Sequence, residues 1–353
     1  MSKLRVGLVG AGSIAQFHVQ SYAKNPDVEI VGVADLKLDR AQAMAAAYGI
    51  PDTFGNHHDL LAMEGLDAIS VCTWNNSHAE ISIDALNAGK DVLCEKPLSR
   101  TVAEALDVQK AVGATGRVLE VGYVRRYGLN TQILKKFVDS GDLGDIYYSK
   151  ASSIRRMGNP GGWFADVERS GGGPLIDIGV HVIDLAWYLM GSPKPVSVSG
   201  NSYHYLGNRA NVIGKSRYEV SDYDPTQNTV EDMANAVIRF ENGASLLMDV
   251  SFSLHASQDT LSVAVFGEKG GAELEPSLLL VSEQHDTMLN IVPQLDSSTF
   301  RMDEGFQAEI DHFVSLCKGD AEPNAPVEHG VELMKMLRAV YESAAAGKEL
   351  RLD

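Results

Sequence analysis

Residues 4 to 15 read LRVGLVGAGSIA, and this stretch decides the fold. Residues 4–9 form a short apolar run that predicts a β-strand. Gly10, Gly12 and Ala15 then occupy the three small positions of a Gly-x-Gly-x-x-Ala pattern, and the amphipathic segment IAQFHVQSYAKN follows as a predicted helix. The stretch therefore predicts a strand and a helix joined by a tight glycine turn.

A second predicted strand, VEIVGVAD, ends at Asp35, about twenty residues past the glycines. This order of elements is the context in which the glycine pattern binds a dinucleotide. Gly10 allows the tight turn, and Gly12 lets the backbone approach a pyrophosphate. The first turn of the helix, which starts with Ser13 and Ile14, offers free N–H groups to the phosphates.

The acid at position 35 favours NAD as the cofactor and leaves NADP possible. Asp35 would accept hydrogen bonds from the adenosine ribose hydroxyls, and its charge would repel a 2′-phosphate. Lys37 and Arg40 lie close by in the sequence, and we interpret them as surface charges on the following helix.

Helical segments and apolar runs continue to alternate up to about residue 123, which predicts a doubly wound parallel sheet. Ligands of such sheets bind at the carboxyl ends of the strands. The residues expected at those ends are Thr73, Trp74, Asn75, Glu95, Lys96, Pro97, Tyr123, Val124 and Arg125.

The pattern changes after residue 123. An alternating strand at 146–156, a strand over 195–207 and a hairpin turn at Asn242-Gly243 predict a large, mostly antiparallel sheet. We expect helices at 127–140, 174–190, 303–319 and 327–346 to cover one face of it. The predicted fold is thus α/β, with a Rossmann domain at 1–123 and an α+β domain at 124–353. The C-terminal helices of the second domain could also pack against the first domain. An apolar second face of the sheet would favour a homodimer or homotetramer.

Composition excludes several classes of protein. The chain has 353 residues and a formal charge of −17, with no basic run for phosphate contacts, so we expect no nucleic-acid partner. No apolar run reaches the roughly 18 residues that a membrane span needs. Cys72, Cys94 and Cys317 show no metal-binding or disulfide spacing, so we expect no metal site and a cytoplasmic location.

The predicted helix at 174–190 is apolar around most of its circumference but carries Asp177, His181 and Asp184. Burying ionisable groups is costly, so these residues either pair within the core or take part in chemistry. Residues four apart share a helix face, which places Asp177 and His181 together. We interpret Asp184 as a helper or a structural partner.

Three motifs, in order, resemble the glucose–fructose oxidoreductase / inositol dehydrogenase (Gfo/Idh/MocA) family. They are GAGSIA, then TWNNSHAE leading into ALNAGKDVLCEKPLS, then SGGGPLIDIGVHVIDL. The resemblance implies an NAD(P)-dependent dehydrogenase of sugars, inositols or related polyols. It also implies that Lys96 lies near the nicotinamide and the reacting hydroxyl, that Asp177 and His181 are the family's aspartate and histidine, and that Asn75 and His78 belong to a cofactor loop. Trp74 stands where the family usually has proline.

These assignments lead to a mechanistic hypothesis. His181 would act as the general base, and Asp177 would orient it or bind a neighbouring substrate hydroxyl. Lys96 would stabilise the developing alkoxide. Residues expected to contact the substrate, because they flank the strand ends or precede the catalytic helix, are Arg125, Tyr127, Arg155, Asn159 and Trp163.

Two other functions remain open from the sequence. The cofactor could stay bound through a closed cycle, as in a sugar epimerase, a sugar–sugar oxidoreductase or a redox-assisted glycosidase. A non-catalytic nucleotide-sensing regulator is the other alternative, although the set Lys96, Asp177 and His181 argues against it. The long polar segment 201–229 would cover the substrate site or mediate assembly.

Overall fold

The computed structural model describes residues 3–207 and 225–352, so most of the predicted loop at 201–229 lies outside the described residues. The chain forms two compact units. Unit 1 contains Met1–Tyr127 and Met302–Met334, and unit 2 contains Gly128–Arg301 and Lys335–Asp353. The segment 302–334 belongs to unit 1 because Ile310, Phe313 and Val314 pack into the same apolar cluster as the first two strands.

Unit 1 is built on a six-stranded sheet in the order β3-β2-β1-β4-β5-β6, in which every pairing is parallel. This confirms the predicted doubly wound sheet. Strands β4, β5 and β6 are mostly apolar and buried along their whole length, as parallel strands covered by helices must be. The strands are β1 (Leu4–Val9), β2 (Val28–Ala34), β3 (Asp52–Phe54), β4 (Ala68–Val71), β5 (Asp91–Glu95) and β6 (Leu119–Gly122).

Helices complete unit 1, and α1 packs against α9 while α4 packs against α5. The short strand β3 and helix α3 were not predicted, because three and five residues are too few to show a period. The helices of this unit are α1 (Ser13–Lys24), α2 (Leu38–Tyr48), α3 (His57–Leu61), α4 (Asn75–Asn87), α5 (Val102–Thr115), α9 (Met302–Cys317) and the first part of α10 (Val327–Ala346).

Unit 2 contains a nine-stranded sheet in the order β14-β13-β12-β11-β7-β10-β9-β8-β15. Among the strand pairings of this sheet in the described residues, only that of β7 with β10 is parallel. The predicted mostly antiparallel sheet is therefore confirmed. The strands are β7 (Ile146–Ile154), β8 (Pro195–Tyr203), β9 (Met233–Phe240), β10 (Ser245–Ser251), β11 (Thr260–Gly267), β12 (Gly270–Glu275), β13 (Leu279–Gln284), β14 (Thr287–Ile291) and β15 (Leu350–Arg351).

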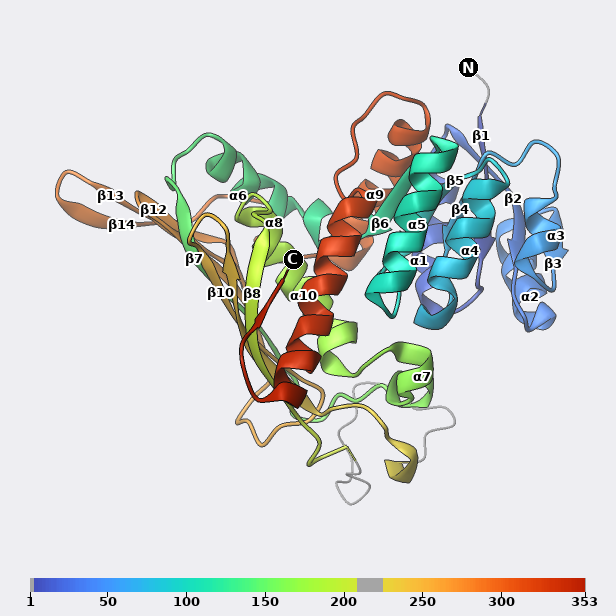
Figure 1. Cartoon of the computed structure of the whole chain (residues 1–353). Coiled ribbons are helices and arrows are strands. Elements are labelled where there is room, and N and C mark those ends of the chain that lie inside the picture. The colour runs from blue at the N-terminus through green and yellow to red at the C-terminus, as the bar shows by residue number, and fades with distance from the viewer. Residues whose placement is uncertain (1–2, 208–224, 353) are drawn as a thin grey trace. The chain divides into compact units, whose positions relative to one another are not determined.

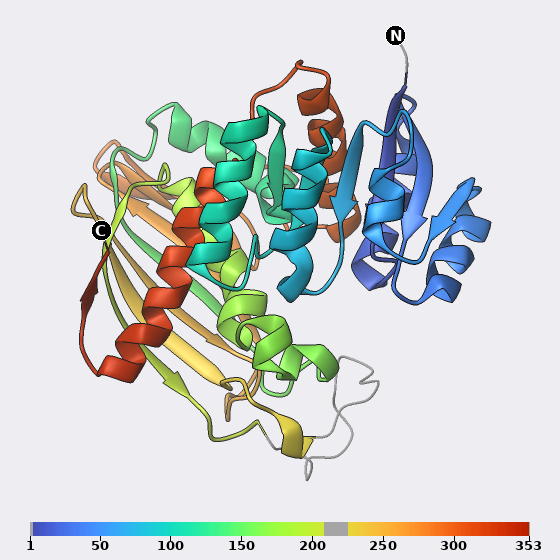
Figure 2. The ribbon, with the colours of Figure 1, turned by 45° about the vertical axis from the view of Figure 1, so that its right-hand side comes forward.

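The two faces of this sheet differ. Leu246, Met248 and Val250 of β10 are buried and point toward the helices, whereas the alternate residue Leu247 is exposed. In both views α6 (Leu129–Asp139), α8 (Val180–Leu189) and the C-terminal part of α10 lie on one side of the strands (Figure 1, Figure 2). The sheet of unit 2 therefore has one covered face and one open face.

The predicted helix at 174–190 differs from a single α-helix. A π-helical turn spans Leu175–Gly179, and α8 starts only at Val180. The predicted strand at 195–207 ends earlier, at Tyr203, and strands β13 to β15 were not predicted. The hairpin turn was predicted correctly: β9 and β10 pair across Asn242-Gly243, where Gly243 has a positive φ of 85°.

Candidate active site

The predicted cofactor residues of unit 1 gather at one edge of its sheet. Gly10 directly follows β1, and Asp35 follows β2. Thr73 comes after β4, and Lys96 follows β5. Because all these strands are parallel, their carboxyl ends meet at the same edge, which is where such sheets bind ligands.

The glycine turn has the geometry that a dinucleotide needs. Gly10 adopts a positive φ of 95°, and a β-carbon there would lie 2.4 Å from the carbonyl oxygen of Cys72, so only glycine fits. A β-carbon at Gly12 would meet no heavy atom within 4 Å. The backbone at Gly12 is thus open to a ligand, and α1 begins at Ser13 with no acidic residue in its first turn. This N-terminus suits a pyrophosphate.

Asp35 is held in place by two backbone groups. Its Oδ2 accepts a hydrogen bond from the Ala11 amide at 2.8 Å, and its Oδ1 accepts one from the Lys37 amide at 2.7 Å. Each carboxylate oxygen keeps a further lone pair, so the group can still accept ribose hydroxyls. The side chains of Lys37 and Arg40 are exposed, as expected for surface charges.

The loop after β4 leads directly into α4. Trp74 is 44% exposed, whereas Asn75 and His78 are buried. Nδ1 of His78 lies 2.7 Å from the Pro97 carbonyl oxygen, and Nε2 lies 3.2 Å from that of Thr73. Burial lowers the pKa of His78, so the imidazole is neutral and carries one proton. The shorter contact indicates that Nδ1 donates this proton to Pro97.

Glu95 points into unit 1 and is buried. Its Oε1 lies 3.0 Å from Nε2 of His18, and its Oε2 accepts a hydrogen bond from the Lys96 amide at 3.2 Å. Lys96 itself is only partly buried. No sequence pattern marks His18, because it looks like any other residue of an amphipathic helix.

The segment after β6 contains one partly buried candidate, Arg125, and one buried candidate, Tyr127. Arg125 is partly buried, and the neighbouring Arg126 is fully buried and donates hydrogen bonds to the Asn324 carbonyl and to Nδ1 of His329. Tyr127 is buried, and its hydroxyl donates to Oε1 of Glu120 at 2.7 Å. Arg126 and Tyr127 thereby connect this segment to the interior of unit 1.

The predicted acid and imidazole lie in unit 2. Between residues 171 and 190, Asp177, His181 and Tyr188 are the partly exposed side chains, and the others are buried. Asp184 is 1% exposed, so it points into the core while Asp177 and His181 reach the surface of the helix. The four-residue spacing keeps the pair on one face even though it spans the junction of the π turn and α8.

Glu231 holds the start of this helix and was not predicted. Its Oε2 accepts a hydrogen bond from the Gly173 amide at 2.9 Å, and its Oε1 accepts one from the Leu175 amide at 3.1 Å. The Tyr341 hydroxyl donates to Oε1 at 2.7 Å. A carboxylate at a helix N-terminus satisfies otherwise unpaired amides. Its sequence separation from the helix, more than fifty residues, gave no local signal.

The loop before the helix carries two further predicted residues. Nδ2 of Asn159 donates to Oδ1 of Asn228 at 3.2 Å, and its Oδ1 accepts from the Gly161 amide at 2.9 Å. Trp163 is partly buried and stacks on Phe164 with ring centroids 3.9 Å apart. Both side chains are thus fixed by contacts within unit 2.

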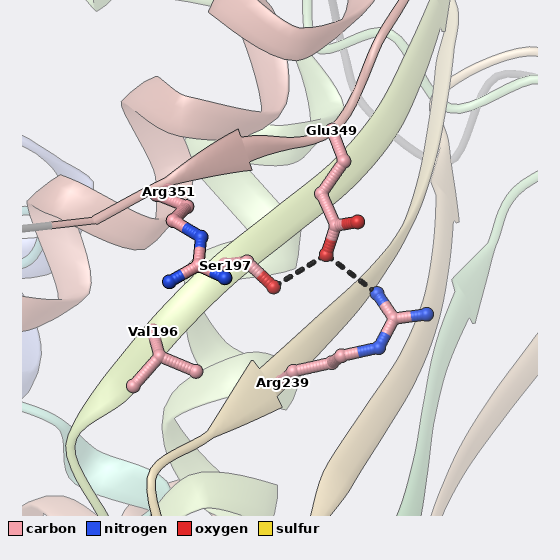
Figure 3. Close-up of a pocket in the computed structure, with 5 residues that line it drawn as sticks. All are labelled: Val196, Ser197, Arg239, Glu349 and Arg351. Atoms are coloured by element: carbon pink, nitrogen blue, oxygen red, sulfur yellow. Dashed lines mark hydrogen bonds and ion pairs between the residues drawn. The ribbon is translucent and has the colours of Figure 1, made fainter.

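Two other features contain none of these residues. A cavity of about 360 Å³ is lined by Val196, Ser197, Arg239, Glu349 and Arg351 (Figure 3). The Glu349 carboxylate there accepts hydrogen bonds from Ser197 and Arg239, so it joins β15 to its neighbours. Among the described residues, His57, His58 and Asp84 bring possible metal-ligand atoms within 4.8 Å of one another, and His57 and Asp84 are in direct contact at 2.9 Å.

Comparison with known proteins agrees with this geometry. Residues 4–123 match the model of an oxidoreductase family with an NAD-binding Rossmann fold, and residues 135–352 match the C-terminal alpha/beta domain of the same family. The chain is 34% identical to D-glucoside 3-dehydrogenase of Escherichia coli, over 99% of this chain and 98% of the relative. It is 26% identical to myo-inositol 2-dehydrogenase of Thermotoga maritima, over 99% of both chains.

Solved structures share the fold over the full length. An oxidoreductase domain protein from Kribbella flavida superposes with a TM-score of 0.86 at 24% identity, over 100% of both chains. A levoglucosan dehydrogenase in complex with NADH and levoglucosan also gives a TM-score of 0.86, at 22% identity and over 100% of both chains.

The fold, together with the glycine turn at the carboxyl edge of the unit 1 sheet, defines an NAD-binding oxidoreductase. The chain belongs to the Gfo/Idh/MocA oxidoreductase family, as the motifs predicted, and it is an enzyme of the type that acts on CH–OH groups. In the described part of the chain, no helix is both long and apolar enough to span a membrane.

Proposed function

We propose that this protein is an NAD-dependent dehydrogenase that oxidises a secondary hydroxyl of a sugar or a related polyol. The observation that carries the proposal is the pair Asp177 and His181, an acid and an imidazole that are partly exposed on a helix whose other residues, apart from Tyr188, are buried. A core histidine with a structural carboxylate would be buried, as Asp184 is. The third residue of the proposed catalytic group is Lys96, which is partly exposed and follows β5 at the carboxyl edge of the unit 1 sheet.

Each of these residues has a defined role in the proposed reaction. A ring nitrogen of His181 takes the proton of the substrate hydroxyl. Histidine suits this role because its side chain ordinarily titrates near neutral pH. Asp177 orients this imidazole or binds a neighbouring substrate hydroxyl. The Lys96 ammonium stabilises negative charge on the substrate oxygen as its proton leaves. A bound nicotinamide supplies the hydride acceptor.

We propose a glycoside or free sugar as the substrate class, ahead of an inositol. The support is the 34% identity to a D-glucoside 3-dehydrogenase over nearly the whole chain, against 26% to an inositol dehydrogenase. Arg125, Asn159 and Trp163 are the residues we propose for substrate binding. An aromatic wall and fixed polar groups suit a ring with several hydroxyls, since each paired hydroxyl excludes analogues that lack it.

We further propose that the enzyme works as a homo-oligomer in a reducing, cytoplasmic compartment. All three cysteines are free thiols, and Cys72 and Cys94 are buried. The open face of the unit 2 sheet carries exposed Leu247, beside Lys150 and Val237 on the neighbouring strands. A mixed apolar and charged face of this kind suits a second copy of the chain related by a two-fold axis.

The proposed function is tested by absorbance at 340 nm with the purified protein, NAD or NADP, and a panel of glycosides, aldoses, sugar acids and inositols. We expect NADH to accumulate with one sugar class, and NAD to be preferred because of Asp35. Absence of net NADH across the panel, with NAD retained on the purified protein, would contradict a simple dehydrogenase and indicate the closed cycle.

The base is tested by His181→Ala with the substrate so identified. We expect kcat to fall about 100-fold or more, because general-base catalysis contributes on that order. His285→Asn is the matched control: it removes an exposed histidine of the same unit, and asparagine tolerates the positive φ of 53° at that turn. Turnover of His181→Ala close to that of the control at every pH would show that another group is the base.

A further inference from the structure

The residues on both sides of Lys96 are in contact with buried imidazoles. On the N-terminal side, the Glu95 carboxylate contacts Nε2 of His18 at 3.0 Å and accepts the Lys96 amide at 3.2 Å. On the C-terminal side, Nδ1 of His78 lies 2.7 Å from the carbonyl oxygen of Pro97. The two imidazoles come from different helices, His18 from α1 and His78 from α4.

The contacts around His18 form a continuous chain of hydrogen-bonding groups. Nδ1 of His18 lies 3.1 Å from Oγ of Ser70, and Oγ lies 2.8 Å from the Tyr22 hydroxyl. The chain therefore runs from Glu95 through His18 and Ser70 to Tyr22. Burial raises the pKa of Tyr22, so its hydroxyl keeps its proton.

A second buried acid lies near this chain. Burial, followed by the nearby carboxyls of Glu95 and Glu120, raises the pKa of Glu309 well above its ordinary value. Neither carboxyl oxygen of Glu309 has a hydrogen-bond partner among the described residues. The raised pKa favours the protonated form of Glu309. Glu95 is the acid whose carboxyl group contacts both His18 and the Lys96 amide.

We propose that His18 and His78 are positioning residues that act through Glu95 and Pro97 to fix the Lys96 backbone. Placing the backbone this firmly restricts where the Lys96 ammonium can lie, although its four-carbon stem is flexible. Catalytic groups displaced by about 1 Å lose on the order of 100-fold in rate. The role rests on the proposed function, in which Lys96 stabilises the substrate oxygen. His78 and Glu95 are thereby assigned to lysine placement rather than to direct cofactor contact.

The test is a double-mutant cycle between His18→Ala and Lys96→Ala, with kcat, the KM for NAD and the thermal midpoint measured for each protein. We expect His18→Ala to lower kcat about 10- to 100-fold with little change in the KM for NAD. In the Lys96→Ala background the same change should have almost no further effect on kcat, since the group that it positions is gone.

Two variants complete the design. His18→Gln keeps an N–H donor and should recover part of the lost kcat. His57→Ala is the matched control in unit 1, because it removes another imidazole–carboxylate contact, with Asp84 at 2.9 Å, that does not involve Lys96. If His18→Ala does not fold, His78→Ala replaces it in the cycle, since it removes the bond to Pro97.

The outcomes separate the two proposals. Full activity of Lys96→Ala would overturn the proposed role of Lys96 in the reaction. A lowered but measurable kcat in Lys96→Ala, together with losses that multiply in the double variant, would leave that role intact and overturn the positioning by His18. A loss of kcat in His57→Ala equal to that in His18→Ala would also overturn it, because general destabilisation would then explain both.

Discussion

At the scale of single residues, burial separates the roles of chemically similar groups. Asp177 and His181 are partly exposed, whereas Asp184, one turn further along α8, is in the core. Arg125 is partly buried, and its neighbour Arg126 is fully buried and bonded within unit 1. Asp177 and Asp184 have the same side chain, as do Arg125 and Arg126. Only the direction in which each side chain points distinguishes the two members of a pair.

Glu309 gives a pH prediction at this scale. Its pKa is raised in the folded protein, so the folded state keeps a proton that the unfolded chain releases above its ordinary pKa of 4.5. The contribution of this group to stability is therefore complete below 4.5 and is lost as pH rises toward the folded pKa. We expect Glu309→Gln to gain stability relative to the parent as the pH increases from about 5 to 8.

Urea unfolding of both proteins at several pH values measures this difference. The comparison with Glu309→Gln cancels the titration of all other groups. A constant difference between the two proteins over that range would contradict a protonated Glu309.

At the scale of elements, the helix that carries Asp177 and His181 depends on a contact from outside it. Pro174 precedes the π turn at Leu175–Gly179, and no side chain of the helix itself caps this end. The amides of Gly173 and Leu175 are instead bonded by Glu231, which the Tyr341 hydroxyl contacts in turn. Burial and the adjacent Glu231 raise the pKa of Tyr341, so its hydroxyl remains a donor.

We expect Glu231→Ala to lower the free energy of unfolding by about 2–4 kcal/mol, because it leaves two buried amides and a hydroxyl without an acceptor. Glu231→Gln should have a smaller effect, since one oxygen remains to accept one amide. Glu241→Ala, an exposed acid in the turn between β9 and β10, is the control and should change stability by less than about 0.5 kcal/mol. Chemical denaturation measures all three, and equal stabilities of Glu231→Ala and the control would refute the capping role.

At the scale of the whole molecule, one face of the unit 2 sheet stays open, because the helices of the described chain pack on the other face. Tyr148 stacks on Phe266 on this face, and Leu247 lies beside Lys150 and Val237. Ala264 pairs with Lys150 on one neighbouring strand and with Glu273 on the other. The open face therefore carries charges of both signs. A face with apolar and opposite charged groups complements a rotated copy of itself.

We expect Leu247→Asp to shift the enzyme toward the monomer, because a buried, unpaired carboxylate at the centre of an interface is costly. Leu129→Asp is the control, since Leu129 has the same 42% exposure as Leu247 but lies at the start of α6. Light scattering coupled to size-exclusion chromatography measures the mass of each variant. A parent protein that is monomeric, or an unchanged oligomer in Leu247→Asp, would rule out this face as the interface.

The sequence alone determined the class of the protein. The glycine turn, Asp35 and the alternation of strands and helices follow from local steric and periodic rules, so they could be predicted without contacts. The same holds for the spacing of Asp177 and His181 on one helix face. These features depend on residues near one another in the chain.

The tertiary structure decided the features that depend on distant residues. The segment 302–334 joins unit 1 because its apolar face completes the core around β1, and Glu231 caps a helix more than fifty residues before it. His18 reaches Glu95 only because α1 packs beside the parallel sheet. Burial and hydrogen bonding across such separations arise from packing, and no local pattern in the chain specifies them.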